Sequence, residues 1–170
     1  MERERLLVVV RHAKAEPFAA SDAERPLSER GTGDAHELGI WLAAQGVVAD
    51  VAYVSYAVRT RQTWSAVAEG AGWTITPHFD GNLYDTDEEG VLELVRTTPE
   101  SARAVVVIGH NPTVGMLAQL LDDGEGEATG AVATEGFPTS AAAVFVVPGA
   151  WAAVEPTSLR LSAFHVGRAD

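Results

Sequence analysis

Two short apolar runs that each lead into a histidine constrain this chain more than any other feature of its sequence. The first run, Leu6–Val10, is followed directly by Arg11 and His12, and the second, Ala104–Ile108, is followed two residues later by His110. Uninterrupted β-branched and apolar runs of this length are typical of strands that are covered on both faces. The chain therefore places charged and titratable side chains at the ends of two buried strands.

Helical patterns separate these runs from further strand-like segments. Apolar residues recur at helical spacing between Ser28, which can cap a helix, and Gly46, which can end one. We expect further helices at 57–70, 88–97 and 111–121, and further strands at 50–55, 74–78, 140–147 and 158–166. Strands that alternate with helices predict an α/β fold with a mostly parallel central sheet.

The carboxyl ends of the strands form the expected ligand-binding edge of such a sheet. Arg11, His12 and His110 lie at strand ends, so they face one crevice if the two strands are neighbours. Arg59 lies in the first turn of the second expected helix, and Arg25 lies in the loop after His12. Guanidinium groups match phosphoryl oxygens in geometry and charge, and an unprotonated imidazole can attack phosphorus. These residues predict a positive pocket for a phosphoryl group.

The composition limits the binding partners and the cellular compartment that we expect for this chain. The 170 residues suffice for one domain, 1–170, and their net charge of −12 argues against nucleic acid or an anionic membrane as the main partner. The absence of cysteine excludes disulfides, zinc–cysteine sites and thiol nucleophiles, and a cytoplasmic enzyme is the expectation. The acidic, glycine-rich segment 122–136 predicts a mobile loop without the spacing of a calcium loop, so we assign no metal and no cofactor.

Four segments, in order along the chain, resemble one known family. The segments "VVVRHAKAE", "ERPLSERG", "SYAVRTRQT" and "VVVIGHNP" are similar to the histidine phosphatase superfamily, and most similar to its small SixA-type phosphohistidine phosphatases. The resemblance extends from Leu6 to about Leu121, and the closing pair of strands also fits. It implies a three-layer α/β/α sandwich of the phosphoglycerate mutase-like kind, with a mostly parallel central sheet in a single histidine phosphatase domain.

The resemblance also implies a role for each candidate residue. His12 would be the nucleophile that becomes transiently phosphorylated. Arg11 and Arg59 would clamp the phosphoryl oxygens, and His110 would hydrogen-bond the same group and stabilise the transition state. Arg25, in the "RPL" segment, would approach the phosphate more peripherally. Water would then hydrolyse the phosphoenzyme without a metal.

The chain departs from the family pattern at two positions. Ala13 follows the nucleophile candidate where the family most often has glycine. Larger members place a glutamate at the position of Asp85, which is therefore a candidate general acid, with a plain loop acid as the alternative. The residues alone also leave a choice between Arg59 and Arg61, which the family spacing decides for Arg59.

These observations lead to one functional hypothesis with two rivals. The hypothesis is a metal-independent, SixA-like protein phosphohistidine phosphatase, since the chain lacks room for the cap insertions that enclose small substrates in larger members. The first rival is a phosphatase of small phosphate esters or phosphoanhydrides, which activity on metabolites would reveal. The second is a non-catalytic module that binds phosphate or a phosphoprotein without hydrolysing it.

Overall fold

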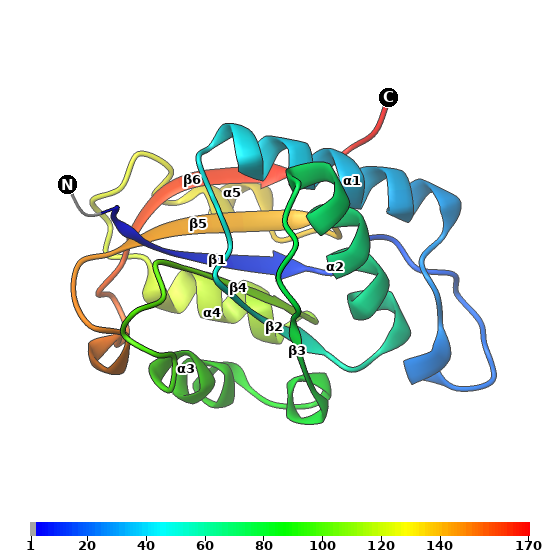
Figure 1. Cartoon of the computed structure of the whole chain (residues 1–170), viewed down its shortest axis with the longest axis horizontal. Helices are drawn as coiled ribbons and strands as arrows, with labels where there is room; N and C mark the ends of the chain where they lie inside the picture. The colour runs from blue at the N-terminus through cyan, green and yellow to red at the C-terminus, as the bar shows by residue number, and fades with distance from the viewer. Residues whose placement is uncertain (1–2) are drawn as a thin grey trace.

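The computed structural model describes residues 3–170, which build a six-stranded sheet (Figure 1). Its strands are β1 (Arg5–Arg11), β2 (Val51–Ser55), β3 (His78–Asp80), β4 (Ala104–Gly109), β5 (Ala141–Val147) and β6 (Arg160–Val166). Across the sheet their order is β3-β2-β4-β1-β5-β6. Strands β1 to β4 run parallel to one another, and β5 runs antiparallel to both of its neighbours. The prediction of an α/β fold with a mostly parallel central sheet is confirmed.

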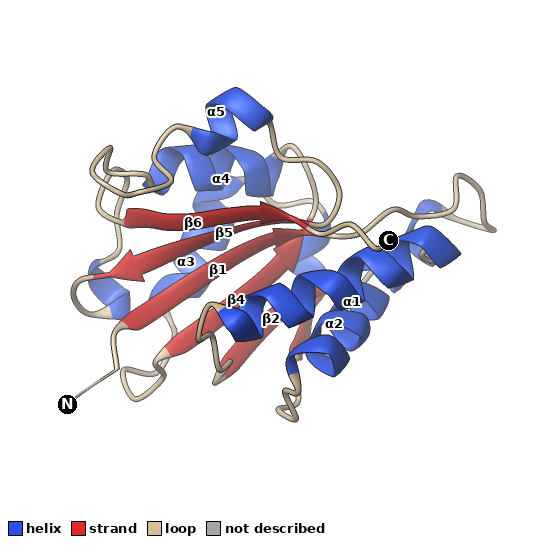
Figure 2. Ribbon diagram, turned by 90° about the horizontal axis from the view of Figure 1, so that it is seen from above, coloured by secondary structure: helices blue, strands red, loops and turns tan. Residues whose placement is uncertain are grey.

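Helices cover both faces of this sheet (Figure 2). One face carries α1 (Glu29–Ala44) and α2 (Val58–Ala71), and the other carries α3 (Glu88–Arg96), α4 (Thr113–Leu121) and α5 (Ala131–Glu135). The short 3₁₀ helices η1 (Asp22–Glu24), η2 (Gly81–Tyr84) and η3 (Trp151–Ala153) lie in connecting segments. The result is the three-layer α/β/α arrangement that the resemblance implies.

The two hydrophobic cores explain why the run Leu6–Val10 of β1 is apolar at every position. In β1, Leu7 and Val9 pack against the layer of α3, α4 and α5, whereas Val8 and Val10 pack against the layer of α1 and α2. All four side chains are fully buried. Because successive residues of a strand point to opposite faces, a strand that is covered twice needs an apolar residue at each position.

The two helices on one face approach each other through glycines. A Cβ atom at Gly39 of α1 would lie 2.1 Å from the carbonyl oxygen of Val67 in α2. A Cβ atom at Gly70 of α2 would lie 2.2 Å from the carbonyl oxygen of His36 in α1. Each glycine therefore admits the backbone of the other helix, at a distance that a side chain would prevent.

The two ends of helix α1 lie close to the residues at which the sequence predicts them. The hydroxyl of Ser28 accepts a hydrogen bond from the main-chain N–H of Gly31 at 3.0 Å, so Ser28 is the predicted N-cap. The helix ends at Ala44, two residues before Gly46, whose φ of +82° is in the left-handed region that glycine adopts readily.

One strand differs from expectation, and the segment expected to be a mobile loop contains a short helix, while its mobility stays a prediction. The third strand lies at 78–80 and not at 74–78, because Trp73 and Ile75 pack against the core of α1 and α2 instead of pairing in the sheet. The segment 122–136 contains helix α5 and is tied to the C-terminal part of the chain. There the main-chain N–H groups of Asp123 and Ala128 donate to the carbonyl oxygens of Leu159 and Leu161.

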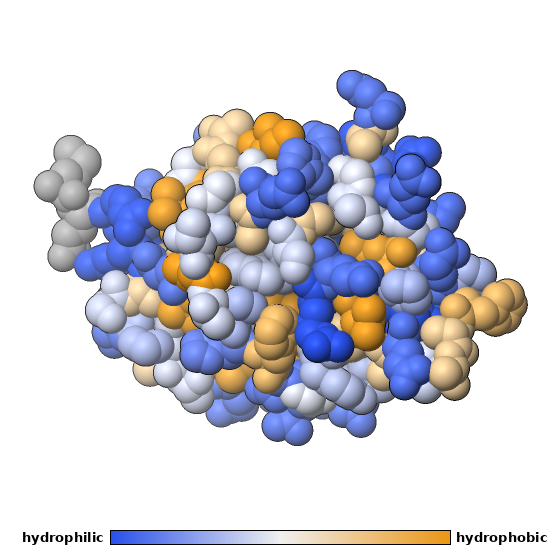
Figure 3. Space-filling model, turned by 45° about the vertical axis from the view of Figure 1, so that its right-hand side comes forward, coloured by the Kyte–Doolittle hydropathy of each residue, from blue (hydrophilic) through white to orange (hydrophobic). Residues whose placement is uncertain are grey.

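The surface is hydrophilic over most of the face shown in Figure 3, with hydrophobic residues in small separate groups. Large hydrophobic residues that are exposed include Phe18, Ile40, Val48, Tyr56, Phe79 and Met116. Among residues 3–170, no helix combines the length and the apolar character needed to cross a membrane.

Candidate active site

The register of the sheet brings two histidines together. β1 and β4 are neighbours, with Arg11 opposite Gly109. The main-chain N–H of His12 donates to the carbonyl oxygen of Gly109 at 3.1 Å, which extends the pairing by one residue beyond β1. The ring centroids of His12 and His110 lie 5.4 Å apart. The two strand ends therefore lie side by side, as the hypothesis of a joint site requires.

His12 is held through both its main chain and its ring. Its carbonyl oxygen accepts a hydrogen bond from the N–H of Ser140 at 3.2 Å, and its ring Nδ1 lies 2.7 Å from the carbonyl oxygen of Ala13. A carbonyl oxygen can only accept, so Nδ1 carries the proton and Nε2 keeps its lone pair. The nitrogen that could attack phosphorus is thereby unprotonated in the neutral ring.

Ala13 fits its position without a glycine conformation. Its main-chain N–H donates to the hydroxyl of Thr63 at 3.0 Å, and its side chain is fully buried. Among the described non-glycine residues, positive φ angles occur at Ser140 and Thr157 and not at Ala13. The replacement of the family's usual glycine therefore introduces no backbone strain here.

Arg59, and not Arg61, faces the two histidines. Arg59 is 6% exposed, whereas Arg61 is exposed and lies 6.0 Å from the ring centroid of Phe79. Nη2 of Arg59 lies 3.4 Å from Nδ1 of His110, and Nε2 of His110 lies 2.8 Å from the hydroxyl of Ser55 at the end of β2. Three neighbouring strand ends, those of β1, β2 and β4, thus contribute to one cluster.

Arg11 and Arg59 each keep a buried donor without a partner. Nη1 of Arg11 donates to the carbonyl oxygen of Phe137 at 3.2 Å, but its Nε has no hydrogen-bond partner among the described residues, and neither has Nε of Arg59. Burying an N–H group without an acceptor costs about 1–3 kcal/mol, and more when the group is charged. An oxyanion bound between the two guanidinium groups would supply the acceptors.

Burial and neighbouring cations keep both histidines neutral. Burial lowers the pKa of His12 from 6.5 to about 3, and the nearby His110, Arg59 and Arg11 act in the same direction, against the hydrogen bond to Ala13. Burial, followed by the positive charge of Arg59, lowers the pKa of His110 from 6.5 to about 4. At neutral pH the site therefore contains two uncharged imidazoles beside two cationic guanidinium groups.

Arg25 is bound within its own loop. Its Nε donates to Oδ1 of Asp22 at 3.0 Å and its Nη1 donates to the carbonyl oxygen of Glu16 at 3.0 Å. Asp22 also accepts a hydrogen bond from Arg59, so Arg25 is connected to the histidines through a carboxylate and a second arginine. A direct contact between Arg25 and phosphate stays a prediction.

Asp85 lies beside this cluster. It is exposed at the end of η2, and no hydrogen bond or ion pair between its side chain and either histidine is found among residues 3–170. Its role as a general acid also stays a prediction.

Asp22 and Tyr84 belong to the site although they were not among the sequence candidates. The hydroxyl of Tyr84 donates to Oδ2 of Asp22. The Tyr84 ring meets His110 edge-on, with centroids 5.4 Å apart and an interplanar angle of 81°, and its centroid lies 5.9 Å from the Arg59 guanidinium. The one sequence signal for Asp22 is its spacing of three residues from Arg25.

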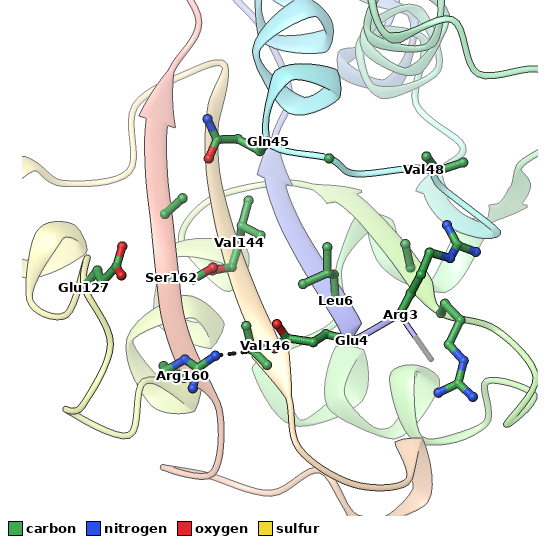
Figure 4. Close-up of a pocket in the computed structure, with 14 residues that line it drawn as sticks. Arg3, Glu4, Leu6, Gln45, Val48, Glu127, Val144, Val146, Arg160 and Ser162 are labelled. Carbon is green, nitrogen blue, oxygen red and sulfur yellow. Dashed lines mark hydrogen bonds and ion pairs between the residues drawn. The ribbon is translucent and has the colours of Figure 1, made fainter. Parts of the chain in front are cut away.

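A second concave region, of about 450 Å³, lies at the opposite end of the sheet (Figure 4). Its lining includes Leu6 at the start of β1 and arginines at its edge. Arg160 pairs with Glu4 at 3.4 Å, and Arg3 lies 3.8 Å from a carboxylate oxygen of Asp50. The described lining contains no histidine, so we do not assign phosphoryl chemistry to it.

Fold and site together define a class of protein with a histidine pair and arginines at the carboxyl edge of a parallel sheet. Residues 7–104 match the model of the histidine phosphatase superfamily (branch 1), and the chain belongs to that superfamily. An uncharacterised protein of Mycobacterium tuberculosis (strain H37Rv) is 36% identical over 162 residues, which cover 94% of this chain and 100% of the relative. Phosphohistidine phosphatase SixA of Escherichia coli (strain K12) is 31% identical over 119 residues, which cover 69% of this chain and 74% of the relative.

A solved structure supports the same assignment. The proposed phosphohistidine phosphatase SixA of Nakamurella multipartitia matches with a TM-score of 0.83 and 28% identity, and the match covers 98% of both chains. The resemblance inferred from the sequence is thereby confirmed, and the comparisons support a phosphatase as the class of enzyme.

Proposed function

We propose that this protein is a metal-independent phosphatase that acts through phosphorylated His12 and takes a phosphohistidine-bearing protein as its substrate. The observation that carries the proposal is the state of the His12 ring. Its Nδ1 is bound to the carbonyl oxygen of Ala13 at 2.7 Å, which leaves Nε2 as a lone-pair donor in the field of Arg59 and Arg11, whose Nε groups have no partner among the described residues.

The proposed reaction has two balanced steps. In the first, the Nε2 lone pair of His12 attacks phosphorus, the bond between phosphorus and the substrate nitrogen breaks, and the leaving imidazole takes up a proton. In the second, water attacks the phosphorus of phosphorylated His12, which releases orthophosphate and restores the free imidazole. Arg11 and Arg59 stabilise the charge on the phosphoryl oxygens. His110 lies beside them and donates a hydrogen bond to the phosphoryl group once its ring has exchanged one of its two contacts, with Arg59 or with Ser55.

Two observations favour a phosphorylated protein over a small molecule. The site lies at the carboxyl edge of the sheet, and residues 3–170 form one sheet with its two helical layers, without an inserted domain over that edge. Two of the similar proteins, from Escherichia coli and Nakamurella multipartitia, carry the name phosphohistidine phosphatase SixA. Small phosphate esters or phosphoanhydrides remain the first alternative substrates, and a binding module without turnover remains the second alternative function.

The test is hydrolysis of p-nitrophenyl phosphate in the presence of EDTA, with wild type compared with His12→Ala. Turnover by wild type would support a phosphatase. Loss of both turnover and acid-labile phosphorylation in the variant would support His12 as the nucleophile. A phosphohistidine-bearing protein is then compared with a panel of small phosphate esters and anhydrides. Preference for a small ester would overturn the substrate assignment, and phosphate binding without hydrolysis of any of these compounds would favour the binding module.

A further inference from the structure

Asp22 holds Arg59 through two different atoms. Oδ2 of Asp22 accepts a hydrogen bond from Nη2 of Arg59 at 3.1 Å, and the main-chain carbonyl oxygen of Asp22 accepts one from Nη1 at 2.8 Å. The carboxylate also accepts hydrogen bonds from Nε of Arg25 and from the hydroxyl of Tyr84. One residue on a short surface helix therefore fixes a buried arginine and links it to two further side chains.

Besides its contacts with Asp22, the Arg59 guanidinium faces His110, because its Nη2 lies 3.4 Å from Nδ1 of that ring. A guanidinium group is a planar fork with five N–H donors, and Asp22 uses donors of both terminal nitrogens. Nε of Arg59 is buried and has no hydrogen-bond partner in the described part of the chain. A phosphoryl group beside the two histidines would supply the acceptor that Nε lacks, provided that it displaces the groups that now cover this edge, and phosphoryl oxygens have the spacing for a bidentate contact with a guanidinium.

We propose that Asp22 is the positioning residue of the site, which turns the Nε edge of Arg59 towards the phosphoryl group. This inference rests on the proposed function, since it assigns the phosphoryl group to the same pocket. Asp22 acts through Arg59, because neither a hydrogen bond nor an ion pair joins it to His12 or His110 among residues 3–170.

The charge of Asp22 suits this role and excludes that of a general acid. The hydrogen bond from Tyr84, followed by the contacts with Arg59 and Arg25, lowers the pKa of Asp22 from 3.8 to about 2. The side chain is consequently a carboxylate at any pH at which the enzyme would work, so it has no proton to donate. The competing hypothesis, based on charge alone, is that Asp22 occupies Arg59 in place of the phosphoryl group and so weakens phosphate binding.

The experiment compares the full chain with Asp22→Ala, Asp22→Asn and the control Glu24→Gln. Glu24 is an exposed acid on the same 3₁₀ helix and makes no side-chain contact with the site. Binding of inorganic phosphate is measured by calorimetric titration, and hydrolysis of p-nitrophenyl phosphate gives kcat and KM. Thermal unfolding of each variant shows whether it is folded.

Loss of the positioning contact is expected to weaken phosphate binding about tenfold and to lower kcat/KM about 100-fold in Asp22→Ala, since small displacements of a catalytic group have effects of this size. In Asp22→Asn the amide oxygen still accepts a hydrogen bond from Arg59, so kcat/KM should recover to within about tenfold of wild type. Glu24→Gln should stay within about twofold. A folded Asp22→Asn that still weakens phosphate binding would support the proposal even if Asp22→Ala did not fold.

A direct readout is the Nε–H resonance of Arg59 in ¹H–¹⁵N spectra, assigned with Arg59→Lys. Phosphate should shift this resonance strongly in wild type and weakly in Asp22→Ala. Tighter phosphate binding by either Asp22 variant would establish competition and overturn the proposal, as would unchanged binding and catalysis in Asp22→Ala. If wild type binds phosphate through Arg59 but hydrolyses no substrate, the proposed function fails, while the binding arm still decides the role of Asp22.

Discussion

The ring Nδ1 of His12 lies 2.7 Å from the carbonyl oxygen of Ala13, the next residue in the chain. This contact fixes the tautomer because a carbonyl oxygen cannot donate. We predict that ¹⁵N spectra of the imidazole will show a protonated Nδ1 and an unprotonated Nε2 between about pH 5 and pH 8. Assignment by comparison with His12→Gln identifies the signals. A proton on Nε2 in this range would contradict the assignment of the attacking nitrogen.

Stability should fall as the pH is lowered through the mildly acidic range. The pKa of His12 is about 3 in the folded protein and close to 6.5 when the ring is free, so the unfolded chain binds the proton more tightly. The contribution of His12 is therefore complete above about pH 6.5 and is lost as the pH falls towards 3. One such group accounts for roughly 2 kcal/mol between about pH 6.5 and pH 4.5.

Urea unfolding at several pH values measures this contribution. His12→Gln should reduce the pH dependence, whatever its effect on stability at neutral pH. The lowered pKa of Asp22, from 3.8 to about 2, acts in the same direction but only below about pH 4, so the two effects separate. A His12→Gln protein with the pH dependence of wild type would show that His12 titrates normally in the folded state.

Thr63 supports the main chain next to His12, and its replacement should lower both stability and activity. Its hydroxyl accepts the main-chain N–H of Ala13 at 3.0 Å and donates to the carbonyl oxygen of Arg59 at 2.7 Å. Thr63→Val leaves a buried N–H group without an acceptor, so we expect a loss of about 1–3 kcal/mol in urea unfolding and a lower kcat. Ser65→Ala is the matched control, because Ser65 donates to the carbonyl oxygen of Arg61 on the exposed face of the same helix. Equal effects of the two substitutions would contradict this account.

Gly39→Ala should force α1 and α2 apart. The added Cβ would lie 2.1 Å from the carbonyl oxygen of Val67, so the helices must separate or the backbone must distort. Overpacking of this kind costs about 1–3 kcal/mol, which outweighs the higher helix propensity of alanine. Thermal or urea unfolding measures the difference. A variant as stable as wild type would show that the two helices can shift without penalty.

Asp85 should matter only when the leaving group needs a proton. The residue is exposed beside Tyr84, and the resemblance to larger family members makes it a candidate general acid. Asp85→Asn is expected to lower hydrolysis of an alkyl phosphate about tenfold or more relative to that of p-nitrophenyl phosphate, whose leaving group is stable without a proton. Asp87→Asn, which replaces a nearby acid that caps α3, serves as control. Equal effects on both substrates would show that Asp85 does not donate a proton to the leaving group and is a plain loop acid.

The parts of the site that the sequence predicted are those that lie next to regular elements. Arg11, His12 and His110 follow buried strands whose apolar runs are visible in the sequence, and the parallel sheet brings their ends together. Asp22 and Tyr84 lie 62 residues apart in two irregular segments, and no periodicity predicts that these segments meet. Their contact depends on the packing of η1 against α2 and of η2 against β2, which local sequence patterns do not encode.

The main chain of His12 is hydrogen-bonded on one side to Gly109 and on the other to Ser140. The proposed nucleophile is therefore part of the framework, whereas Asp22, Arg25 and Tyr84 come from the segments that surround it. The imidazole and the groups around it thus have separate structural supports in this chain. Under the proposed function, substitutions or insertions in the surrounding segments change which substrate is accepted, while the imidazole of His12 keeps its place.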